Sequence, residues 1–419
     1  MSDESQLIVI SASARAAVWS ARQSGFTAFA IDQFGDVDLR EAASRVCVVD
    51  GWPRSVLDAA ATLPEGPFVF GGGLENSPEL IEELASSREL LGCSAKILRL
   101  VRDPFWLTDC WRSAGLRVLR LLAGNAEPGS DSVWLRKSLN SAGGLGVRID
   151  DGRPTGDDVL QEFVRGDVVS GLFLTNGGEV RLLGMSSQLV GRAEAGTDGF
   201  VYCGSIWPAE RDDRDCVEAT RSHAPSGNAA FDALPPSVDD AERRSGTFPR
   251  RAWERESQAL VAGEAVLSAA GLVGLFGIDF VRDECGELWP IEVNPRYPAS
   301  AEQCERSTGW PLMRWHVDAC RSGRLPADLE LAELSGGSGR TEGKIVVYSP
   351  RDMPAPDLRS LGSRLQPANA QLADIPVVGS PLKLGAPVCS ILSSADGEAE
   401  CREKLLKLAA TLRSELATE

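Results

Sequence analysis

The sequence predicts an α/β fold for about the first hundred residues and an α+β fold for most of the rest. Up to residue 100, short apolar segments alternate with helical segments, which is the pattern of a doubly wound parallel sheet. From Val133 onward, apolar strands follow one another around glycine-containing turns, which favours antiparallel pairing. The length of 419 residues is enough for two or three domains and a sizeable core.

Composition excludes several classes of function. With 43 basic and 60 acidic residues, the net charge of −17 argues against nucleic acid or an anionic membrane as the main partner. No apolar stretch approaches the roughly 20 residues of a membrane span, and the acidic start, MSDESQ, is unlike a signal peptide. The ten cysteines are scattered without a CxxC pair, which favours the cytoplasm. Because His223 and His316 are the only histidines in the sequence, any catalysis is expected to depend on acids, Lys, Arg and backbone amides.

In the first region, strands and helices alternate. We expect strands at residues 7–11, 27–32, 46–50 and 67–71, and helices at 14–23, 55–61 and 78–90. The turn after the first strand, SASARA, lacks G-x-G-x-x-G, which disfavours a dinucleotide-binding dehydrogenase. Three glycines at 71–73 follow the fourth strand, at the edge where open α/β sheets bind ligands, so they either line a substrate site or form a plain turn.

A connector helix and a glycine loop open the second region. Asp103 and Pro104 are typical of the first positions of a helix, which we expect at 105–114. Next, the strand around Lys137 runs into a loop with Gly143, Gly144 and Gly146. Glycines let backbone amides approach phosphates, and the lysine adds a mobile positive charge, although a plain hairpin has the same pattern. It is not a Walker loop, because no helix follows and the lysine precedes the glycines.

The segment 159–169 is an apolar strand with Gln161 and Glu162 at its centre. Such a polar break can present backbone groups to an adenine edge and a carboxylate to a ribose; alternatively, this is an edge strand with Glu162 in solvent. Antiparallel strands are expected at 168–174 and 180–190. The polar stretch 208–250 is interpreted as a surface excursion, followed by a helix at 251–270.

Residues 275–302 form a hairpin that carries two acids. With strands at 276–282 and 288–293 and a four-residue turn at 283–286, Asp279 faces Pro290, so Asp279 and Glu292 become diagonal neighbours about 7–8 Å apart. A turn of odd length would break this parity unless a bulge restored it. Asn294 follows Glu292 on the same face. Two carboxylates and an amide oxygen suit Mg²⁺, with phosphates and water completing its shell, although both acids of such a hairpin can also point to solvent.

The order of these parts resembles the ATP-grasp superfamily over roughly residues 1–325. Asp279 and Glu292 are 13 residues apart, similar to D-alanine–D-alanine ligase, whereas IEVNPR followed by Glu302 is more similar to biotin carboxylase and carboxyaminoimidazole ribonucleotide synthetase. Gly277 stands where D-alanine–D-alanine ligase carries Arg, which also favours the carboxylase-like branch. Ser138 replaces the proline that usually follows the lid lysine.

The resemblance implies three parts. A pre-ATP-grasp doubly wound domain on the substrate side covers 1–100. A two-lobed ATP-grasp domain covers 101–330, with the lid at about 130–200, the excursion at 208–250 and the metal hairpin at 275–302. A small β-rich C-terminal region covers 331–419, with a strand from Lys344, a β-region at 374–392 and a closing helix at 398–416.

Roles for individual residues also come from the resemblance. Asp279, Glu292 and Asn294 would be metal ligands, and Arg296 and Lys137 would be catalytic, stabilising the phosphoryl oxygens. The lysine that relatives usually carry near the connector helix is missing; the nearest cations are Arg102 and Arg112, of which Arg102 is the expected phosphate contact. The nucleotide would be held by Lys137, Gly143, Gly144, Gly146, Gln161, Glu162, Phe163, Val164 and Arg102.

The expected function is an ATP-dependent carboxylate–amine ligase that activates a small carboxylate as an acyl-phosphate and releases ADP and phosphate. The alternatives are bicarbonate-dependent carboxylation through carboxyphosphate, and a degenerate nucleotide-binding protein. ATP and Mg²⁺ are the expected cofactors, with Mn²⁺ as an alternative ion, and a homodimer is the expected assembly. V-R-D-P and D-I-P-x-x-G also resemble ligases that occur with tetrahydromethanopterin-linked one-carbon enzymes, which implies a role in cofactor or one-carbon metabolism.

Overall fold

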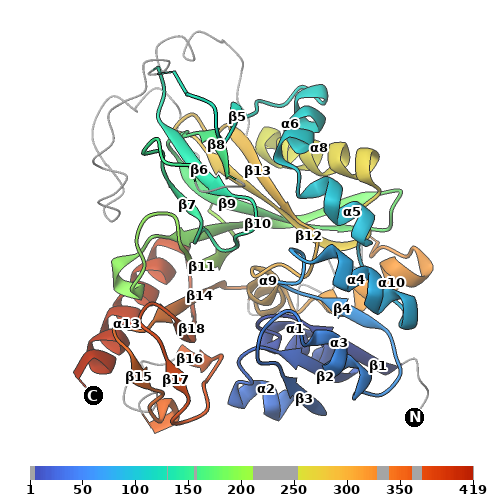
Figure 1. Cartoon of the computed structure of the whole chain (residues 1–419), viewed down its shortest axis with the longest axis vertical. Helices are drawn as coiled ribbons and strands as arrows, with labels where there is room; N and C mark the ends of the chain where they lie inside the picture. The colour runs from blue at the N-terminus through green and yellow to red at the C-terminus, as the bar shows by residue number, and fades with distance from the viewer. Residues whose placement is uncertain are drawn as a thin grey trace.

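The computed structural model describes residues 5–129, 131–154, 158–210, 253–327, 339–360 and 370–418. Most of the expected excursion at 208–250 therefore lies outside the described residues. The described chain forms an N-terminal part, an upper part built from two sheets, and a C-terminal part (Figure 1). None of the helices in the described ranges has both the length and the apolar character needed to span a bilayer.

The N-terminal part is a parallel four-stranded sheet in the order β3-β2-β1-β4, which confirms the predicted α/β start. Leu7 and Val9 of β1 pack into one buried cluster, while Ile8 and Ile10 pack into another, so both faces of the sheet are covered. One helix, α2, was not expected. The elements are β1 Gln6–Ile10, α1 Arg15–Gln23, β2 Thr27–Asp32, α2 Val37–Ala42, β3 Arg45–Val48, α3 Val56–Ala61, β4 Phe68–Phe70 and α4 Pro78–Ser87.

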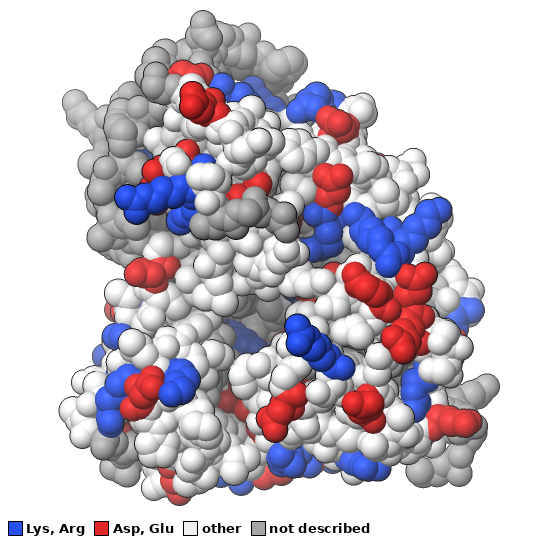
Figure 2. All heavy atoms as spheres, in the orientation of Figure 1, with Lys and Arg blue, Asp and Glu red and all other residues white. Residues whose placement is uncertain are grey.

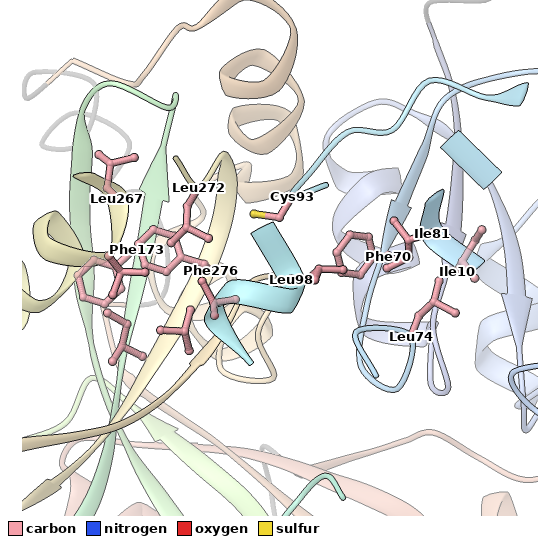
Figure 3. Packing of buried hydrophobic residues seen from close by; sticks show 14 of the residues in the cluster. Ile10, Phe70, Leu74, Ile81, Cys93, Leu98, Phe173, Leu267, Leu272 and Phe276 are labelled. Atoms are coloured by element: carbon pink, nitrogen blue, oxygen red, sulfur yellow. The ribbon is translucent and has the colours of Figure 1, made fainter. Parts of the chain in front are cut away.

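Two helices, α5 (Ala95–Val101) and α6 (Pro104–Ser113), connect this part to the next. The carboxylate of Asp103 accepts hydrogen bonds from the backbone amides of Phe105 and Trp106 at 2.9 and 3.2 Å, which explains where α6 begins. Figure 3 shows Leu98 of α5 between Phe70 of the N-terminal sheet and Phe276 of the large sheet. All three side chains belong to one buried cluster, so the N-terminal part and the large sheet share a core.

A small antiparallel sheet in the order β5-β8-β6-β7 overlaps the first part of the expected lid and is called the lid sheet below; the role of a lid stays a prediction. Its strands are β5 Leu121–Ala123, β6 Trp134–Ser138, β7 Val147–Ile149 and β8 Asp158–Glu162. β8 lies between β5 and β6, so the alternative of an exposed edge strand around Glu162 is wrong.

The large sheet has eight strands in the order β13-β12-β9-β10-β11-β14-β18-β16. Its strands are β9 Asp167–Thr175, β10 Val180–Val190, β11 Tyr202–Trp207, β12 Gly274–Arg282, β13 Leu288–Asn294, β14 Thr341–Tyr348, β16 Ala370–Ala373 and β18 Pro387–Ala395. The C-terminal strands β14, β18 and β16 continue the sheet of the preceding part, and the division of the chain at residue 330 stays a prediction.

Helices cover the large sheet. Three leucines of α13, Leu405, Leu408 and Leu412, are buried in the core beneath the C-terminal strands. A two-stranded β15–β17 sheet lies beside them. The remaining elements are η2 Ala193–Ala195, α8 Trp253–Ala270, α9 Ala301–Thr308, α10 Leu312–Ser322, β15 Met353–Pro354, β17 Pro381–Leu382 and α13 Glu398–Thr418. Figure 2 shows a hollow near the centre of this face, between the C-terminal and N-terminal parts, with a basic side chain inside it.

Candidate active site

A cavity of about 300 Å³ lies where the β5-β8-β6-β7 sheet, the β12–β13 hairpin (the expected metal hairpin) and the loop after β4 meet. It brings together almost all of the site residues that the sequence predicts. Those lining the cavity are Arg102, Lys137, Gly143, Gly144, Gln161, Glu162, Phe163, Val164, Asp279, Glu292, Asn294 and Arg296. Gly146, which the sequence also predicts as a site residue, is not among the residues that line it.

The register of the β12–β13 hairpin differs from the prediction. The turn has five residues, 283–287, and a bulge lies between Asp279 and Phe280. Phe280, not Asp279, therefore pairs with Pro290, and Asp279 pairs directly with Glu292. The expected diagonal arrangement was wrong because an odd turn shifts the register by one residue and the bulge shifts it again. The two carboxylates remain on one face and are direct cross-strand neighbours.

Asp279 is held by two amide groups. Gln188 Nε2 donates to Asp279 Oδ1 at 2.8 Å, and Asn294 Nδ2 donates to Oδ2 at 3.1 Å. Burial and, after it, the charge of Glu292 together raise the pKa of Asp279 to about 7. Opposed carboxylates whose charges repel each other fit a hard divalent cation, because the cation would offset both charges. Within the described ranges, no cluster of three or more His, Cys, Asp or Glu side chains suits a metal, so two carboxylates plus amide oxygens are the donors available.

Arg296 connects the metal hairpin to the N-terminal part. Its Nη2 donates to Asn294 Oδ1 at 2.9 Å, its Nε donates to Glu75 Oε1 at 2.7 Å, and its Nη1 donates to the carbonyl of Tyr297 at 3.4 Å. Burial alone would lower the pKa of Arg296, but the charge and hydrogen bond of Glu75 and the charges of Asp279 and Glu292 together outweigh it and raise the pKa. Among the contacts of the described residues, these use three of the five N–H groups of a guanidinium, which leaves two for an anionic ligand. The Asn294 oxygen, expected to bind metal, accepts a hydrogen bond from Arg296 in this structure.

The lid supplies a second cation. Lys137 Nζ donates to Gln161 Oε1 at 3.3 Å, so the predicted phosphate contact and the predicted adenine hinge touch each other. Arg102 donates to Asn76 Oδ1 and, at 3.1 Å, to the carbonyl of Leu139, and thereby joins the N-terminal loop to the lid.

Glu162 differs from the expectation. Its carboxylate is 4% exposed and accepts from Arg120 Nε at 3.1 Å and Nη2 at 3.2 Å, so it is paired and not solvated; its contact with a ribose stays a prediction. The sequence interpretation overlooked Arg120 because it lies 42 residues upstream, on the approach to the neighbouring strand β5.

The glycine loop of the lid contacts the segment before β11. The amide of Tyr202 donates to the carbonyl of Gly143 at 2.9 Å. Gly144 has a φ of +78°, and a Cβ at this position would collide with the carbonyl of Phe200. Only glycine fits here, since both the backbone angle and the space exclude a side chain.

Glu302 lies in an ionic cluster outside the cavity lining. Arg15 Nη2 donates to Glu302 Oε2 at 2.8 Å, Lys344 Nζ lies 3.3 Å from the same carboxylate, and both cations also contact Asp374. Burial raises the pKa of Glu302, but the charges of Arg15 and Lys344 outweigh it and lower the pKa to about 2. The cluster joins α1, α9 and β14, so its role in this structure is to connect three parts of the chain.

Comparisons with known proteins identify the fold. The family model for the ATP-grasp domain matches residues 124–225. No curated protein sequence matches the chain significantly. An ADP complex of N5-carboxyaminoimidazole ribonucleotide synthetase is similar in structure, with a TM-score of 0.64, 14% identity and coverage of 98% of each chain.

Two other solved structures are similar. The biotin carboxylase domain dimer of 2-oxoglutarate carboxylase from Hydrogenobacter thermophilus, in complex with MgADP, ADP and bicarbonate, has a TM-score of 0.59 and 15% identity, covering 94% of this chain and 86% of that chain. The L-amino acid ligase from Bacillus licheniformis has a TM-score of 0.60 and 15% identity, covering 99% and 97%. The ATP-grasp fold that the sequence predicts is thereby confirmed.

Proposed function

We propose that this chain is an ATP-dependent ligase that activates a small-molecule carboxylate as an acyl-phosphate for attack by an amine. The observation that carries the proposal is the direct pairing of Asp279 with Glu292 in a cavity that Arg296 and Lys137 also line. Opposed acids and converging cations are the groups that phosphoryl transfer needs, since its catalysis is mainly positioning and electrostatic stabilisation.

ATP would lie between the lid and the large sheet. Lys137 would contact a phosphate, the loop with Gly143 and Gly144 would close over it, and residues 161–164 would hold the adenine, as their place along one cavity supports. Asp279 and Glu292 would hold Mg²⁺, which would supply positive charge to offset that of the phosphates. Crystal structures of similar chains with ADP and MgADP support the same nucleotide and ion here.

The reaction would have two steps. A carboxylate oxygen attacks the γ-phosphorus of ATP; the new O–P bond forms as the bond to the bridging oxygen breaks, and ADP leaves. The amine nitrogen then attacks the acyl carbon; the C–N bond forms, the C–O bond breaks, phosphate leaves with the electron pair, and the amine proton passes to solvent. Arg296 would hold the oxygens of the transferring group with its two remaining N–H groups.

Carboxylation of an amine through carboxyphosphate is the second candidate. It is supported by the similarity to the 2-oxoglutarate carboxylase domain that was solved with bicarbonate. The acceptor pocket would draw on residues 71–76, 191–205 and 296–302 in both cases.

A homodimer and a cytoplasmic location belong to the proposal as well. The location is proposed because none of the nine cysteines in the described ranges is in a disulfide.

The test is ADP release from ATP and Mg²⁺ with a panel of small carboxylic acids and amines supplied singly and in pairs. Turnover that requires an added acid supports the ligase, and turnover that requires bicarbonate supports the carboxylase. Binding of nucleotide without turnover across the whole panel would contradict both and leave a nucleotide-binding protein.

A further inference from the structure

Glu75, in the loop after β4, has one carboxylate oxygen that accepts no hydrogen bond from the described residues. The side chain is 2% exposed, and its Oε1 accepts from Arg296 Nε at 2.7 Å. Its Oε2 is buried and has no hydrogen-bond partner among the described residues. A buried carboxylate oxygen without a donor is destabilising, so the stability of the fold does not explain it.

The cations that line the cavity donate elsewhere. Lys137 donates to Gln161, Arg102 donates to Asn76 and the carbonyl of Leu139, and Arg296 uses its Nε on the other oxygen of Glu75. Glu75 itself lines the cavity. Because the last torsion of a glutamate side chain is soft, a small rotation of the carboxylate turns Oε2 towards that space. The missing donor can therefore come from a ligand.

We propose that Glu75 Oε2 accepts an N–H group of the amine substrate, which makes Glu75 the amine-binding residue of the site; this rests on the proposed function. A primary amine or its ammonium form suits the position because charge-assisted N–H bonds to a carboxylate are the stronger ones. The amine then lies beside Arg296, which would hold the acyl-phosphate. The amine on Glu75 and the acyl-phosphate on Arg296 would then be neighbours, because Glu75 and Arg296 form a salt bridge between the N-terminal part and the β12–β13 hairpin.

The kinetic test compares the wild type with Glu75→Gln, which keeps an oxygen for Arg296 but loses the negative charge. The acid is the one found in the panel, and hydroxylamine serves as the amine, so that product is measured as hydroxamate. In Glu75→Gln we expect the half-saturating concentration of hydroxylamine to rise at least about tenfold, as loss of a charge-assisted hydrogen bond requires. The ADP burst in the absence of amine is measured alongside, because it reports any effect of the substitution that acts through Arg296.

The matched control is Glu79→Gln, an exposed glutamate in the first turn of α4, which should behave as the wild type. If the burst falls in Glu75→Gln while the half-saturating concentration is unchanged, Glu75 acts only through Arg296 and the proposal is overturned. Unchanged values for both quantities, or wild-type rates that never saturate with hydroxylamine, overturn it too.

A second measurement does not depend on turnover. In crystals soaked with MgADP and methylammonium chloride, we expect the nitrogen within hydrogen-bond distance of Glu75 Oε2 and no such density in Glu75→Gln. An empty position in the wild type overturns the amine site. A wild type that releases no ADP with any acid contradicts the ligase function, and the soak then decides the amine site separately.

Discussion

At the scale of single residues, Glu292 carries the most specific expectation. It faces Asp279 across the hairpin, and its charge contributes to the raised pKa of Asp279. Glu292→Gln keeps the shape but removes one of the two carboxylates, so Mg²⁺-dependent ADP release should fall by at least about a hundredfold. The measurement is steady-state turnover with the fold checked by circular dichroism. Glu284→Gln, an exposed acid in the turn of the same hairpin, is the control. Normal turnover in Glu292→Gln would remove the metal assignment.

The pKa of Asp279 predicts a pH dependence of Mg²⁺ binding. Because burial and Glu292 raise this pKa to about 7, the cation must displace a proton below that pH. Affinity for Mg²⁺, measured by calorimetry, should therefore increase from pH 6 to pH 8. The effect of Asp279 on the stability of the metal-free protein has the opposite sign. As pH rises from 3.8 towards 7, Asp279 loses its proton in the unfolded chain before it does in the folded one, so the free energy of unfolding falls over that range. A Mg²⁺ affinity that is the same at pH 6 and pH 8 would contradict the shift.

Sequence alone predicts Asp279, Glu292, Arg296 and Lys137 as site residues, because each stands in a recognisable local pattern. Glu75, Gln188 and Arg120 were not predicted, although each holds a predicted site residue. Glu75 lies 221 residues from Arg296, and Gln188 lies 91 residues from Asp279. Spacing along the chain carries no information about such contacts, since only the packing of the sheets brings them together.

At the scale of elements, the lid loop yields a matched pair of variants. Gly143 and Gly144 have φ values of +62° and +78°, so alanine is strained at both, by about 1–2 kcal/mol. Only at position 144 would a Cβ also collide with the carbonyl of Phe200; at 143 nothing lies within 4 Å. We expect Gly144→Ala to lower kcat/KM for ATP about tenfold more than Gly143→Ala, because it also prevents the loop from lying on this segment. Equal effects of the two variants would mean that backbone strain alone matters and that this contact has no part in closing the lid.

Most elements follow from local patterns, but register does not. The apolar segments of β1, β2, β9 and β10 and the start of α6 at Asp103 lie where they were predicted, since alternation and capping are local signals. The pairing of Asp279 with Glu292 was mispredicted because one extra turn residue and one bulge each move the register. The short helices α2 and α5 were missed, having too few turns for a clear period.

At the scale of the whole molecule, the order of the large sheet could not be predicted. β11 pairs with β14, which is more than a hundred residues further along the chain, and through it the C-terminal strands join the ATP-grasp sheet. The cluster of Arg15, Glu302, Lys344 and Asp374 lies at this junction. Its side chains are between 1% and 17% exposed, so their charges are costly unless they stay paired.

The pairing of these buried charges predicts that Glu302→Gln lowers the stability of the fold by a large amount. Loss of one carboxylate leaves Arg15 with Asp374 and Asp38, and Lys344 with Asp374, and removing one partner of a buried pair costs about 3–5 kcal/mol. The free energy of unfolding in urea should fall by this order at pH 7. Glu89→Gln is the control: Glu89 pairs with Arg321 at the surface with its side chain 49% exposed, and its loss should cost under about 1 kcal/mol.

The pKa of Glu302 in this cluster also determines the pH range over which the wild type is more stable than Glu302→Gln. The pKa of Glu302 is about 2 in the folded chain against an ordinary 4.5, so its contribution is fully present above 4.5 and is lost as pH falls towards 2. The stability difference between the wild type and Glu302→Gln should therefore be constant from pH 7 to about 5 and shrink below it. A difference that instead grows on acidification would show that Glu302 is not held ionised by Arg15 and Lys344, and that the three parts of the chain are connected in another way.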